Sequence, residues 1–372
     1  MLNNIVKPTL LLKKSRALRN IETMINKADG NRVRFRPHFK THQSAAIGEW
    51  YKERGVTAIT VSSVDMARYF VNHGWQDITV AFPVNMREID KINALAETIT
   101  LHLLVEAEES VHFLGSRLTS PAKLWIKIDT GYHRTGLSWD HREKIAALAG
   151  TVEQGKDLIF QGLLTHSGHS YQARSHQQVR EIYADTVTKM QAAREGLRQA
   201  GFAGVEISIG DTPSCSIVED LSDVDEIRPG NFVFYDATQF AIGSCSEEQI
   251  AVAVACPVVA KHQERQELII YGGAVHLSKD VLMQSFELWG EKPTYGAIAL
   301  PEDSGWGPIL PNAYVAGISQ EHGVVKASQE IFARVNVGDL LMVIPVHSCL
   351  TANLLRKYVT FEGEIIELAD LS

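Results

Sequence analysis

Short apolar runs alternate with amphipathic stretches over the first two thirds of the chain. Eight runs rich in β-branched and apolar residues predict strands: VRFRP (33–37), TAITVS (57–62), DITVAF (77–82), ITLHLLV (99–105), KLWIKID (123–129), LIFQGLLTH (158–166), VEISIG (205–210) and EIRPGNFVFYD (226–236). The helical stretches between them, such as 44–54, 66–73, 86–97 and 177–200, are long enough to cross from one parallel strand to the next. An open doubly wound sheet would show the same alternation, but the count of eight favours a (β/α)8 TIM barrel.

The pattern changes from about residue 250 to strands without helical stretches between them. These strands are AVAVACPVVAKH (251–262), ELIIYGG (267–273), AYVAGISQ (313–320), GVVKA (323–327), DLLMVIPVH (339–347) and YVTFEGEIIEL (358–368). The opening segment PTLLLKKS (8–15) is also strand-like, precedes a predicted helix over 16–27, and is expected to pair with this C-terminal domain. The predicted organisation is therefore a barrel over 14–245 and an all-β domain made of 1–13 and 246–372.

Composition excludes several classes of protein. Subtracting 44 acidic from 36 basic residues leaves a net charge of −8, without a basic run that could follow phosphates, so nucleic acid is not an expected partner. The amino terminus lacks the pattern of a signal peptide, and no apolar stretch reaches the roughly 20 residues that span a bilayer. Four scattered cysteines without a CxxC pair indicate reduced thiols, so a cytoplasmic protein without membrane contact is expected.

Candidate chemical groups follow the ends of the predicted strands, where the active sites of barrels form, except that the RPGN segment lies within the eighth predicted strand. They are Lys40 in RPHFKTH, Arg134 in DTGYHRTG, His166 and Tyr171 in THSGHSY, Gly210 and Thr212 in GDTPS, and Arg228, Gly230 and Asn231 in RPGN. Taken singly, each has an ordinary explanation as a solvated lysine, a loop glycine or a core histidine. Five such segments at one rim favour an active site.

Lys40 stands between His38 and His42. Neighbouring cations and partial burial would lower the pKa of its amine and make it a nucleophile. The segments GDTPS and RPGN are suited to a phosphate, because free backbone N–H groups at helix starts point at an anion. A lysine for a Schiff base together with a phosphate site suggests pyridoxal 5'-phosphate.

These motifs resemble those of the D-serine dehydratase and D-threonine aldolase family, fold-type III pyridoxal phosphate enzymes whose barrel is shared with alanine racemase. The resemblance covers most of the chain. It implies that Lys40 binds the cofactor covalently, that Arg134 lies near its phenolic oxygen, that His166 lies against its ring, and that GDTPS and RPGN hold its phosphate. Tyr171 and Arg228 both match residues that contact the pyridine nitrogen in relatives, and Tyr171 is preferred. Gln43 departs from the pattern, since many relatives have a second lysine there.

The segment PVHSC holds His347 and Cys349, which would point to the same side of an extended chain. An imidazole and a thiolate suit zinc, although HxC alone is a weak signal. The resemblance implies a zinc site here, or a site for another divalent metal, because the dehydratases have HxC where D-threonine aldolases tend to have HxD. With only two protein ligands, water and substrate would complete the coordination, as in a catalytic site. The segment SQEHG, with Glu321 and His322, is either part of the site or a plain turn.

The resemblance implies a zinc-dependent dehydratase, an ammonia-lyase that converts a small D-β-hydroxy amino acid such as D-serine into a 2-oxo acid and ammonia. Lys40, His347 and Cys349 would be its catalytic residues, with a homodimer as the expected assembly. The alternatives are D-threonine aldolase-like cleavage to glycine and an aldehyde, an amino-acid racemase, and a non-catalytic pyridoxal phosphate binding protein. The β domain and the HSC segment count against the last of these, and a racemase would not need the metal.

Overall fold

The structure, a computed structural model, describes residues 2–371 of the chain as two compact units. One unit consists of residues 22–230 and 369–372, and the other of residues 1–21 and 231–368. Helix α1 (Lys14–Asn31) contains one of the points of division. The domain limits expected from the sequence, 14–245 for the barrel and the remainder for the β domain, stay a prediction.

The first unit contains a sheet of parallel strands. Its strands are β2 (Arg34–Phe35), β3 (Ala58–Val61), β4 (Asp77–Pro83), β5 (Thr100–Val105), β6 (Ala122–Asp129), β8 (Leu158–Leu164), β9 (Glu206–Ile209) and β10 (Glu226–Ile227). They follow the order β2-β10-β9-β8-β6-β5-β4-β3, and the short strand β7 (Leu137–Ser138) pairs with β6. A parallel bridge between His38 and Thr60 joins the segment after β2 to β3. The ring of eight strands confirms the predicted (β/α)8 barrel.

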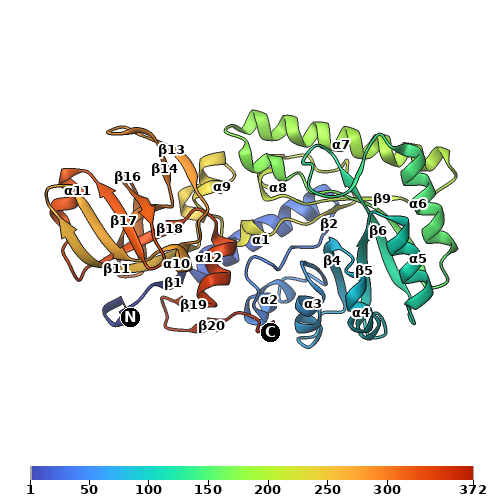
Figure 1. The fold of residues 1–372 in the computed structure, drawn as a ribbon, viewed down its shortest axis with the longest axis horizontal. Helices are drawn as coiled ribbons and strands as arrows, with labels where there is room; N and C mark the ends of the chain where they lie inside the picture. The colour runs from blue at the N-terminus through green and yellow to red at the C-terminus, as the bar shows by residue number, and fades with distance from the viewer. Residues whose placement is uncertain (1, 372) are drawn as a thin grey trace. The chain divides into compact units, whose positions relative to one another are not determined.

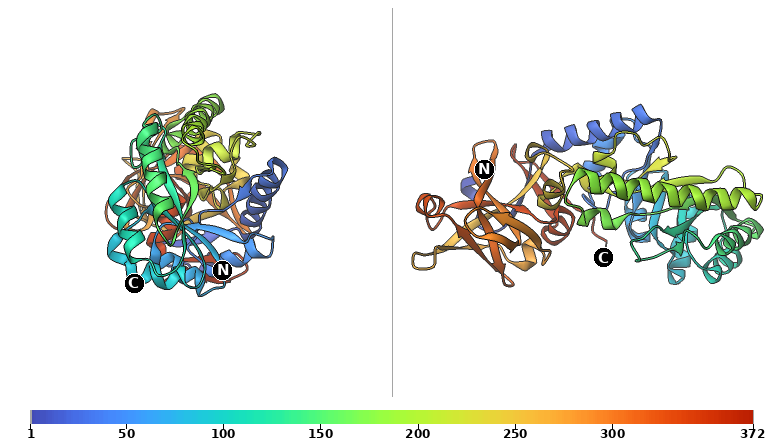
Figure 2. Two further views of the ribbon diagram at one scale, coloured as in Figure 1. Left: turned by 90° about the vertical axis from the view of Figure 1, so that its right-hand side faces the viewer. Right: turned by 90° about the horizontal axis from the view of Figure 1, so that it is seen from above.

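Helices cover the outside of this barrel (Figure 1). They are α2 (Ala45–Lys52), α3 (Val64–Val71), α4 (Ile89–Ala96) after the 3-10 turn η2 (Met86–Glu88), α5 (Glu108–Arg117), α6 (Arg142–Gln154), η3 (Gly168–Gln172), α7 (His176–Gln199) and α8 (Thr212–Ile217). The longest of them, α7, runs along one side of the unit in both figures (Figure 2). The four helical stretches predicted between strands are therefore confirmed.

The eighth predicted strand is much shorter than the sequence pattern indicated. Strand β10 ends at Ile227, and residues 228–230 form a loop before the 3-10 turn η4 (Asn231–Val233). Pro229 explains the early end, because proline has no N–H group to donate to a neighbouring strand. Its carbonyl instead accepts a hydrogen bond from the backbone of His38 at 2.9 Å. The RPGN segment therefore follows the strand, where a binding loop is expected, instead of lying within it.

Buried charges fill part of the barrel wall. Arg36, which is 1% exposed, contacts Glu226 at 2.7 Å and Asp77 at 2.5 Å. Asp77 also contacts the ring of His102 at 3.1 Å, and Glu226 accepts a hydrogen bond from Ser208 at 2.7 Å. Since a buried charge is stable only when paired, this network joins strands β2, β4, β5, β9 and β10 by more than backbone hydrogen bonds.

The second unit is built on a nine-stranded sheet, with the order β12-β17-β16-β15-β18-β11-β1-β19-β20. Its strands are β1 (Thr9–Leu12), β11 (Val252–His262), β12 (Glu267–Tyr271), β15 (Gly296–Glu302), β16 (Gly305–Ile318), β17 (His322–Ala327), β18 (Leu340–Pro345), β19 (Lys357–Thr360) and β20 (Ile365–Glu367). An additional pairing between β12 and β11 closes part of the sheet into a ring. Strand β1 pairs antiparallel with β11, which confirms that the amino-terminal strand belongs to the β domain.

The second unit also contains elements that the sequence pattern missed. They are the hairpin of β13 (Leu282–Phe286) and β14 (Gly290–Thr294), the 3-10 turns η1 (Leu2–Asn4) and η5 (Glu247–Gln249), and the short helices α9 (Ala237–Ile242), α10 (Ala274–Leu277), α11 (Gln329–Arg334) and α12 (Ser348–Leu355). The predicted β domain is therefore confirmed as mostly strand, and these short elements are the exceptions to the predicted pattern. Leucine and alanine, both good helix formers, favour α12 directly after strand β18.

No helix among residues 2–371 combines the length and the apolar character needed to span a membrane.

Candidate active site and metal pair

Lys40 lies in the turn that follows the closing bridge of the barrel. The backbone N–H of Lys40 donates a hydrogen bond to Nδ1 of His38 at 3.3 Å. The preceding residue, Phe39, is fully buried and packs edge-on against Phe70 and Trp75, with ring centroids 5.0 and 5.1 Å apart. Because Phe39 anchors the turn in the core, the side chain of Lys40 is left exposed at its surface.

Two histidines near Lys40 are held in the neutral form. Burial first, and then the positive charge of Lys40, hold the pKa of His166 well below its usual range. The same two causes, in the same order, lower the pKa of His38, and Arg228 adds to the effect. A neutral imidazole beside a lysine can pack against an aromatic cofactor without adding a further positive charge.

The arginine loop DTGYHRTG is shaped by Asp129 at the end of β6. Oδ1 of Asp129 accepts hydrogen bonds from the backbone N–H groups of Gly131 at 2.9 Å and His133 at 3.1 Å. Its Oδ2 lies 2.9 Å from Nδ1 of His133. The guanidinium of Arg134 lies over the ring of Tyr132, 5.1 Å from the centroid. The loop therefore presents Arg134 on an aromatic support.

Tyr132 joins this loop to the histidine loop THSGHSY. Its ring lies edge-on to His166, with centroids 5.9 Å apart. A Cβ atom at Gly168 would lie only 2.4 Å from the ring of Tyr132, so glycine is needed for this close approach. Tyr132 was not among the residues predicted for the site, because an aromatic residue in a loop carries no signal of its own.

His166, Tyr171 and Thr212 meet around the GDTPS loop. Nδ1 of His166 contacts the carbonyl oxygen of Gly210, and the backbone N–H of Thr212 donates to the hydroxyl of Tyr171 at 3.3 Å. Thr212 is fully buried, and its hydroxyl has no hydrogen-bond partner within residues 2–371. An unpaired buried hydroxyl at this position is what a bound phosphate would satisfy.

Arg228 is 4% exposed and held from two strands. Its Nε donates to the hydroxyl of Ser208 at 2.6 Å, and its Nη2 donates to the carbonyl oxygen of Thr165 at 2.6 Å. Burial lowers the pKa of Arg228 to about 10, so the guanidinium stays charged at neutral pH. A Cβ atom at Gly210 would lie 3.0 Å from Arg228, which shows how closely the phosphate loop approaches it. The preference for Tyr171 over Arg228 at the pyridine nitrogen stays a prediction.

Gly230 lies against the lysine turn. A Cβ atom at this position would lie 2.8 Å from the carbonyl oxygen of His38. The RPGN loop and the Lys40 turn therefore touch through backbone atoms. The predicted site residues Lys40, Arg134, His166, Tyr171, Gly210, Thr212, Arg228 and Gly230 all belong to the barrel unit, on segments that follow β2, β6, β8, β9 and β10.

Lys127 is a second lysine of this region, which the sequence analysis missed. It is 5% exposed, and its Nζ donates to the carbonyl oxygen of Ile128 at 3.1 Å. Burial first, and then the charges of Arg228 and Arg134, lower its pKa to about 7. The only sequence signal was a lysine inside the strand KLWIKID, a position more often occupied by an apolar residue.

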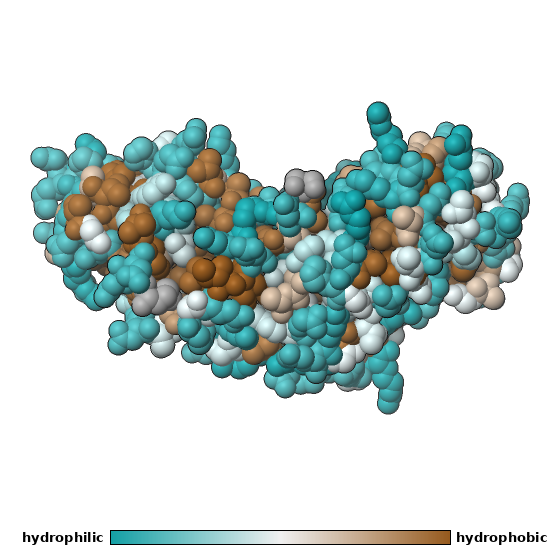
Figure 3. Space-filling view, turned by 90° about the horizontal axis from the view of Figure 1, so that it is seen from below, coloured by the Kyte–Doolittle hydropathy of each residue, from teal (hydrophilic) through white to brown (hydrophobic). Residues whose placement is uncertain are grey.

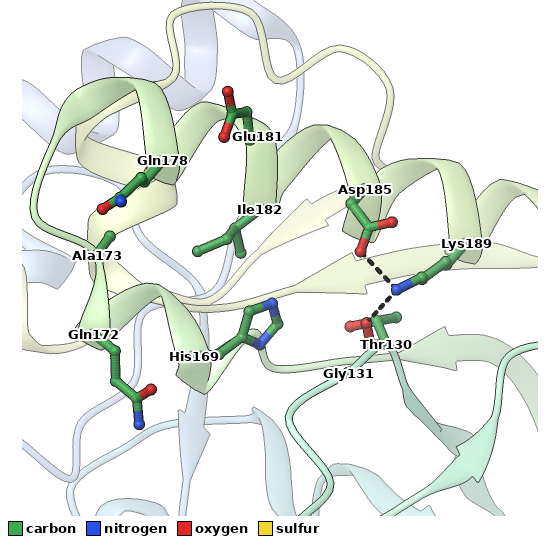
Figure 4. Close-up of a pocket in the computed structure, with 10 residues that line it drawn as sticks. All are labelled: Thr130, Gly131, His169, Gln172, Ala173, Gln178, Glu181, Ile182, Asp185 and Lys189. Atoms are coloured by element: carbon green, nitrogen blue, oxygen red, sulfur yellow. Dashed lines mark hydrogen bonds and ion pairs between the residues drawn. The ribbon is translucent and has the colours of Figure 1, made fainter.

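A separate cavity of about 560 Å³ lies between the arginine loop, the histidine loop and α7. Figure 4 shows Lys189 reaching from α7 to Thr130, and the ammonium donates to the carbonyl oxygen of Thr130 at 3.0 Å and to Asp185 at 2.6 Å. None of the predicted cofactor residues lines this cavity. Lys189 therefore links the arginine loop to α7 by a hydrogen bond. The cavity is a different site from the one expected to hold the cofactor.

The barrel residues fit pyridoxal phosphate. They offer an exposed lysine amine, neutral imidazoles, an unpaired buried hydroxyl at Thr212, and close backbone approaches at Gly210 and Gly230. An amine forms the covalent link that this cofactor uses, and backbone N–H groups with a hydroxyl suit its phosphate.

His347 and Cys349 lie together at the start of α12. His347 is the extended residue before the helix and Cys349 belongs to its first turn, so the expectation of a continuous extended segment is wrong. Their side chains nevertheless interact. Burial would lower the pKa of His347, but the Cys349 thiolate and the carboxylate of Asp280 outweigh it and raise the pKa to about 11. Nδ1 of His347 lies 2.8 Å from Oδ2 of Asp280, an arrangement that leaves Nε2 for a metal.

The pair fits a zinc ion by the chemistry of its donors, an imidazole and a thiolate. Among residues 2–371, no cluster of three or more histidine, cysteine or acidic side chains could hold a metal ion. The assignment of His347 and Cys349 as the two protein ligands of a metal stays a prediction.

Asn231 lies in the β unit and not in the barrel unit. Its side-chain amide donates to Asp236 at 2.6 Å, to the hydroxyl of Ser348 at 3.0 Å and to Sγ of Cys349 at 3.6 Å. Through these contacts Asn231 binds to the turn that carries His347 and Cys349. Its expected contact with the cofactor phosphate stays a prediction.

The role of the SQEHG segment and the effect of Gln43 both stay open. Glu321 lies in the turn between β16 and β17, 3.7 Å from the ring of His276, and His322 begins β17. Gln43 has a left-handed backbone with φ of 48°, and its carbonyl oxygen accepts a hydrogen bond from Ala369 at 2.6 Å.

The chain matches two protein-family models in succession. Residues 13–238 match the alanine racemase N-terminal domain, and residues 251–361 match the family described as "Putative serine dehydratase domain". D-threo-3-hydroxyaspartate dehydratase from Delftia sp. is 28% identical over 92% of this chain and 91% of its own. D-serine dehydratase from Dictyostelium discoideum is 28% identical over 96% of this chain and 93% of its own.

Solved structures agree with these matches. The structure of the Delftia dehydratase has a TM-score of 0.90, with 26% identity over 99% of this chain and 98% of its own. A cysteine-to-alanine variant of that enzyme, solved in the metal-free form, has the same TM-score and coverage. The fold and the order of the two matched domains agree with the resemblance found in the sequence. The chain belongs to the alanine racemase N-terminal domain family, among the fold-type III pyridoxal phosphate enzymes that carry a serine dehydratase domain.

Proposed function

We propose that this protein is a pyridoxal phosphate and zinc dependent dehydratase that converts a D-3-hydroxy amino acid into a 2-oxo acid and ammonia. The observation that carries the proposal is the pairing of His347 with Cys349 in a chain whose barrel presents Lys40 beside two neutral histidines. The relatives named above act on D-serine and on D-threo-3-hydroxyaspartate, which both carry a hydroxyl at the third carbon.

Some barrel residues hold the cofactor, and one of them, Lys40, also moves a proton. Pyridoxal phosphate supplies an electron sink for charge that develops at the substrate Cα. Lys40 would hold the cofactor through Nζ, and its amine is the group that would take the proton from the substrate Cα. Thr212, Gly210 and Gly230 hold the phosphate, and Arg134 orients the phenolic oxygen from its support on Tyr132.

His347 and Cys349 hold the metal. A zinc ion supplies Lewis acidity that helps the 3-hydroxyl to leave. Cβ loses its oxygen as water, and a later hydrolysis at Cα releases ammonia. The solved metal-free form of a cysteine variant of the Delftia relative supports a role of Cys349 in metal binding.

The same thiolate separates this proposal from aldol cleavage. A borderline-soft sulfur ligand favours zinc, whereas a carboxylate at that position would favour harder ions such as manganese. The resemblance noted from the sequence assigns HxC to dehydratases and HxD to aldolases, and this chain has Cys349.

The proposal is tested by incubating zinc-loaded protein with D-serine, D-threonine and D-threo-3-hydroxyaspartate, and with L-serine as the control. Ammonia and the matching 2-oxo acid should form from D-substrates only. Equal turnover of L-serine, or conversion of D-serine to L-serine without ammonia, would contradict it.

We further infer a cytoplasmic homodimer. Figure 3 shows apolar residues among hydrophilic ones on the face seen from below. Exposed apolar side chains also occur elsewhere, in and beside the β13–β14 hairpin, at Val281, Met283 and Leu288. Exposed apolar side chains of this kind support contact with a second subunit. All four cysteines are buried, and none of them forms a disulfide within residues 2–371, which supports a reducing compartment. Light scattering on the purified protein tests the dimer.

A further inference from the structure

The side chain of Asn231 is buried against the turn that carries His347 and Cys349, the two residues proposed to bind the metal. It is 5% exposed, and its two amide hydrogens face three acceptors: the carboxylate of Asp236 at 2.6 Å, the hydroxyl of Ser348 at 3.0 Å and the sulfur of Cys349 at 3.6 Å. The short contact with Asp236 uses one hydrogen. The other is shared between Ser348 and Cys349, and it will favour whichever acceptor carries more negative charge.

Asp236 decides which end of the Asn231 amide faces the sulfur. Oδ2 of Asp236 also accepts hydrogen bonds from the backbone N–H of Ser348 at 3.0 Å and from its hydroxyl at 3.3 Å. Oδ1 accepts a further one from the backbone of Gln239 at 3.0 Å. With the amide turned over, the oxygen of Asn231 would lie against the carboxylate, so only the orientation with the N–H groups toward Asp236 and Cys349 is stable.

The same carboxylate fixes the backbone between the two metal ligands. Ser348 stands between His347 and Cys349, and both its N–H group and its hydroxyl are bound by Asp236, which is 1% exposed. The spacing of the imidazole and the thiolate is therefore held from a residue more than a hundred positions earlier in the chain.

We infer that Asn231, oriented by Asp236, is a positioning residue that donates an N–H hydrogen bond to the Cys349 thiolate and thereby sets the strength and electronic character of the metal site. The inference rests on the proposed function, because it assigns a role toward the metal of that function. A hydrogen bond to a coordinating thiolate stabilises charge on the sulfur, and such outer contacts typically change metal affinity by about 10- to 100-fold.

The test uses the full-length protein and cobalt, whose charge-transfer band from sulfur reports on the thiolate directly. Asn231→Leu removes the donor and keeps a similar volume. Thr238→Val is the matched control, since Thr238 supports the same turn through the carbonyl oxygen of Val346 at 2.8 Å but has no hydrogen bond to Cys349. Asp236→Asn is the second variant, because it removes the charge that orients the amide. Thermal unfolding of the metal-free proteins establishes that each variant is folded.

We expect Asn231→Leu to bind cobalt about 10-fold or more weakly in competition with a chelator. The charge-transfer band should move to longer wavelength, because sulfur without its N–H donor gives up electrons more readily. Asp236→Asn should shift the band in the same direction, and Thr238→Val should match the wild type. An unchanged band and affinity in folded Asn231→Leu would overturn the inference while leaving the proposed function intact. A wild-type protein without a sulfur-to-cobalt band would overturn the metal site itself, and the inference with it.

Discussion

Nδ1 of His347 lies 2.8 Å from Oδ2 of Asp280, although 67 positions separate the two residues in the sequence. A carboxylate in this position fixes the ring orientation and the tautomer with the proton on Nδ1, so that Nε2 is the atom presented to a metal. Asp280 therefore orients His347, one of the two residues proposed to bind the metal.

Replacing Asp280 by alanine should weaken zinc binding about 10- to 100-fold, because the ring of His347 would lose its orienting partner. Competition with a zinc chelator measures the change. Asp303→Ala, an exposed acidic residue elsewhere in the β unit, is the control and should bind zinc as the wild type does. Equal affinities for Asp280→Ala and the wild type would show that the contact has no part in metal binding.

Lys40→Ala should lose the visible absorbance of covalently bound pyridoxal phosphate, because no other amine is expected to form the link. Lys91→Ala, which removes a surface lysine paired with Asp65 at 2.9 Å, should keep the spectrum. Absorbance spectra before and after borohydride reduction, followed by mass spectrometry of the labelled peptide, identify the modified residue. A label on Lys127 in the wild type would contradict the assignment.

Gly168→Ala should lower turnover and cofactor content, since the added methyl group would lie 2.4 Å from the ring of Tyr132 and displace the support of Arg134. Overpacking of this kind costs about 1–3 kcal/mol. The double variant Gly168→Ala with Tyr132→Ala should have the same cofactor content as Tyr132→Ala alone, because the added methyl group acts only through its clash with the Tyr132 ring. Additive losses in the double variant would argue that the two residues act independently.

The barrel was predictable because each of its eight strands corresponds to a short apolar run in the sequence, such as DITVAF (77–82) for β4. The predicted cofactor residues were selected by their place at strand ends, and the structure places Lys40, His166 and Arg228 near His38 in the barrel unit. Their contact with a cofactor stays a prediction. Predicting the early end of β10 would have required giving more weight to Pro229, whose missing N–H outweighs the apolar run that follows it.

The supporting residues were not predictable, because their partners are distant in sequence. Asp280 and Asp236 stand in unremarkable segments, and only the fold brings them to His347 and Ser348. The helical position of Cys349 was missed for a different reason. Two residues at spacing two were read as one extended segment, whereas α12 begins between them at Ser348.

Glu226→Gln should destabilise the protein by about 3 kcal/mol at neutral pH, since it leaves the buried Arg36 without one of its two carboxylate partners. Burial alone would raise the pKa of Glu226, but Arg36 and Arg34 hold it below its ordinary value. The contribution of Glu226 to the free energy of unfolding is therefore complete above about pH 4.3, the pKa of a glutamate in the unfolded chain. It is lost as the pH falls from there through the lower pKa of Glu226 in the folded protein.

Urea unfolding at pH 7 and near pH 4 checks this prediction. The difference in the free energy of unfolding between the wild type and Glu226→Gln should be smaller at the lower pH. Glu206→Gln is the matched control, because the side chain of Glu206 forms its ion pair with the half-exposed Arg34 and its replacement should cost less than about 1 kcal/mol. A gap that is constant with pH would show that Glu226 is not ionised in the native state.

The most direct measurement of the central claim follows D-threonine by proton NMR with wild-type protein, first stripped of metal with EDTA and then supplied with zinc. The account predicts no turnover without metal and conversion to 2-oxobutyrate and ammonia after zinc is added, while the absorbance of the bound cofactor stays unchanged throughout. Glycine and acetaldehyde as the products, or 2-oxobutyrate formation that EDTA does not affect, would contradict the assignment of this chain as a metal-dependent dehydratase.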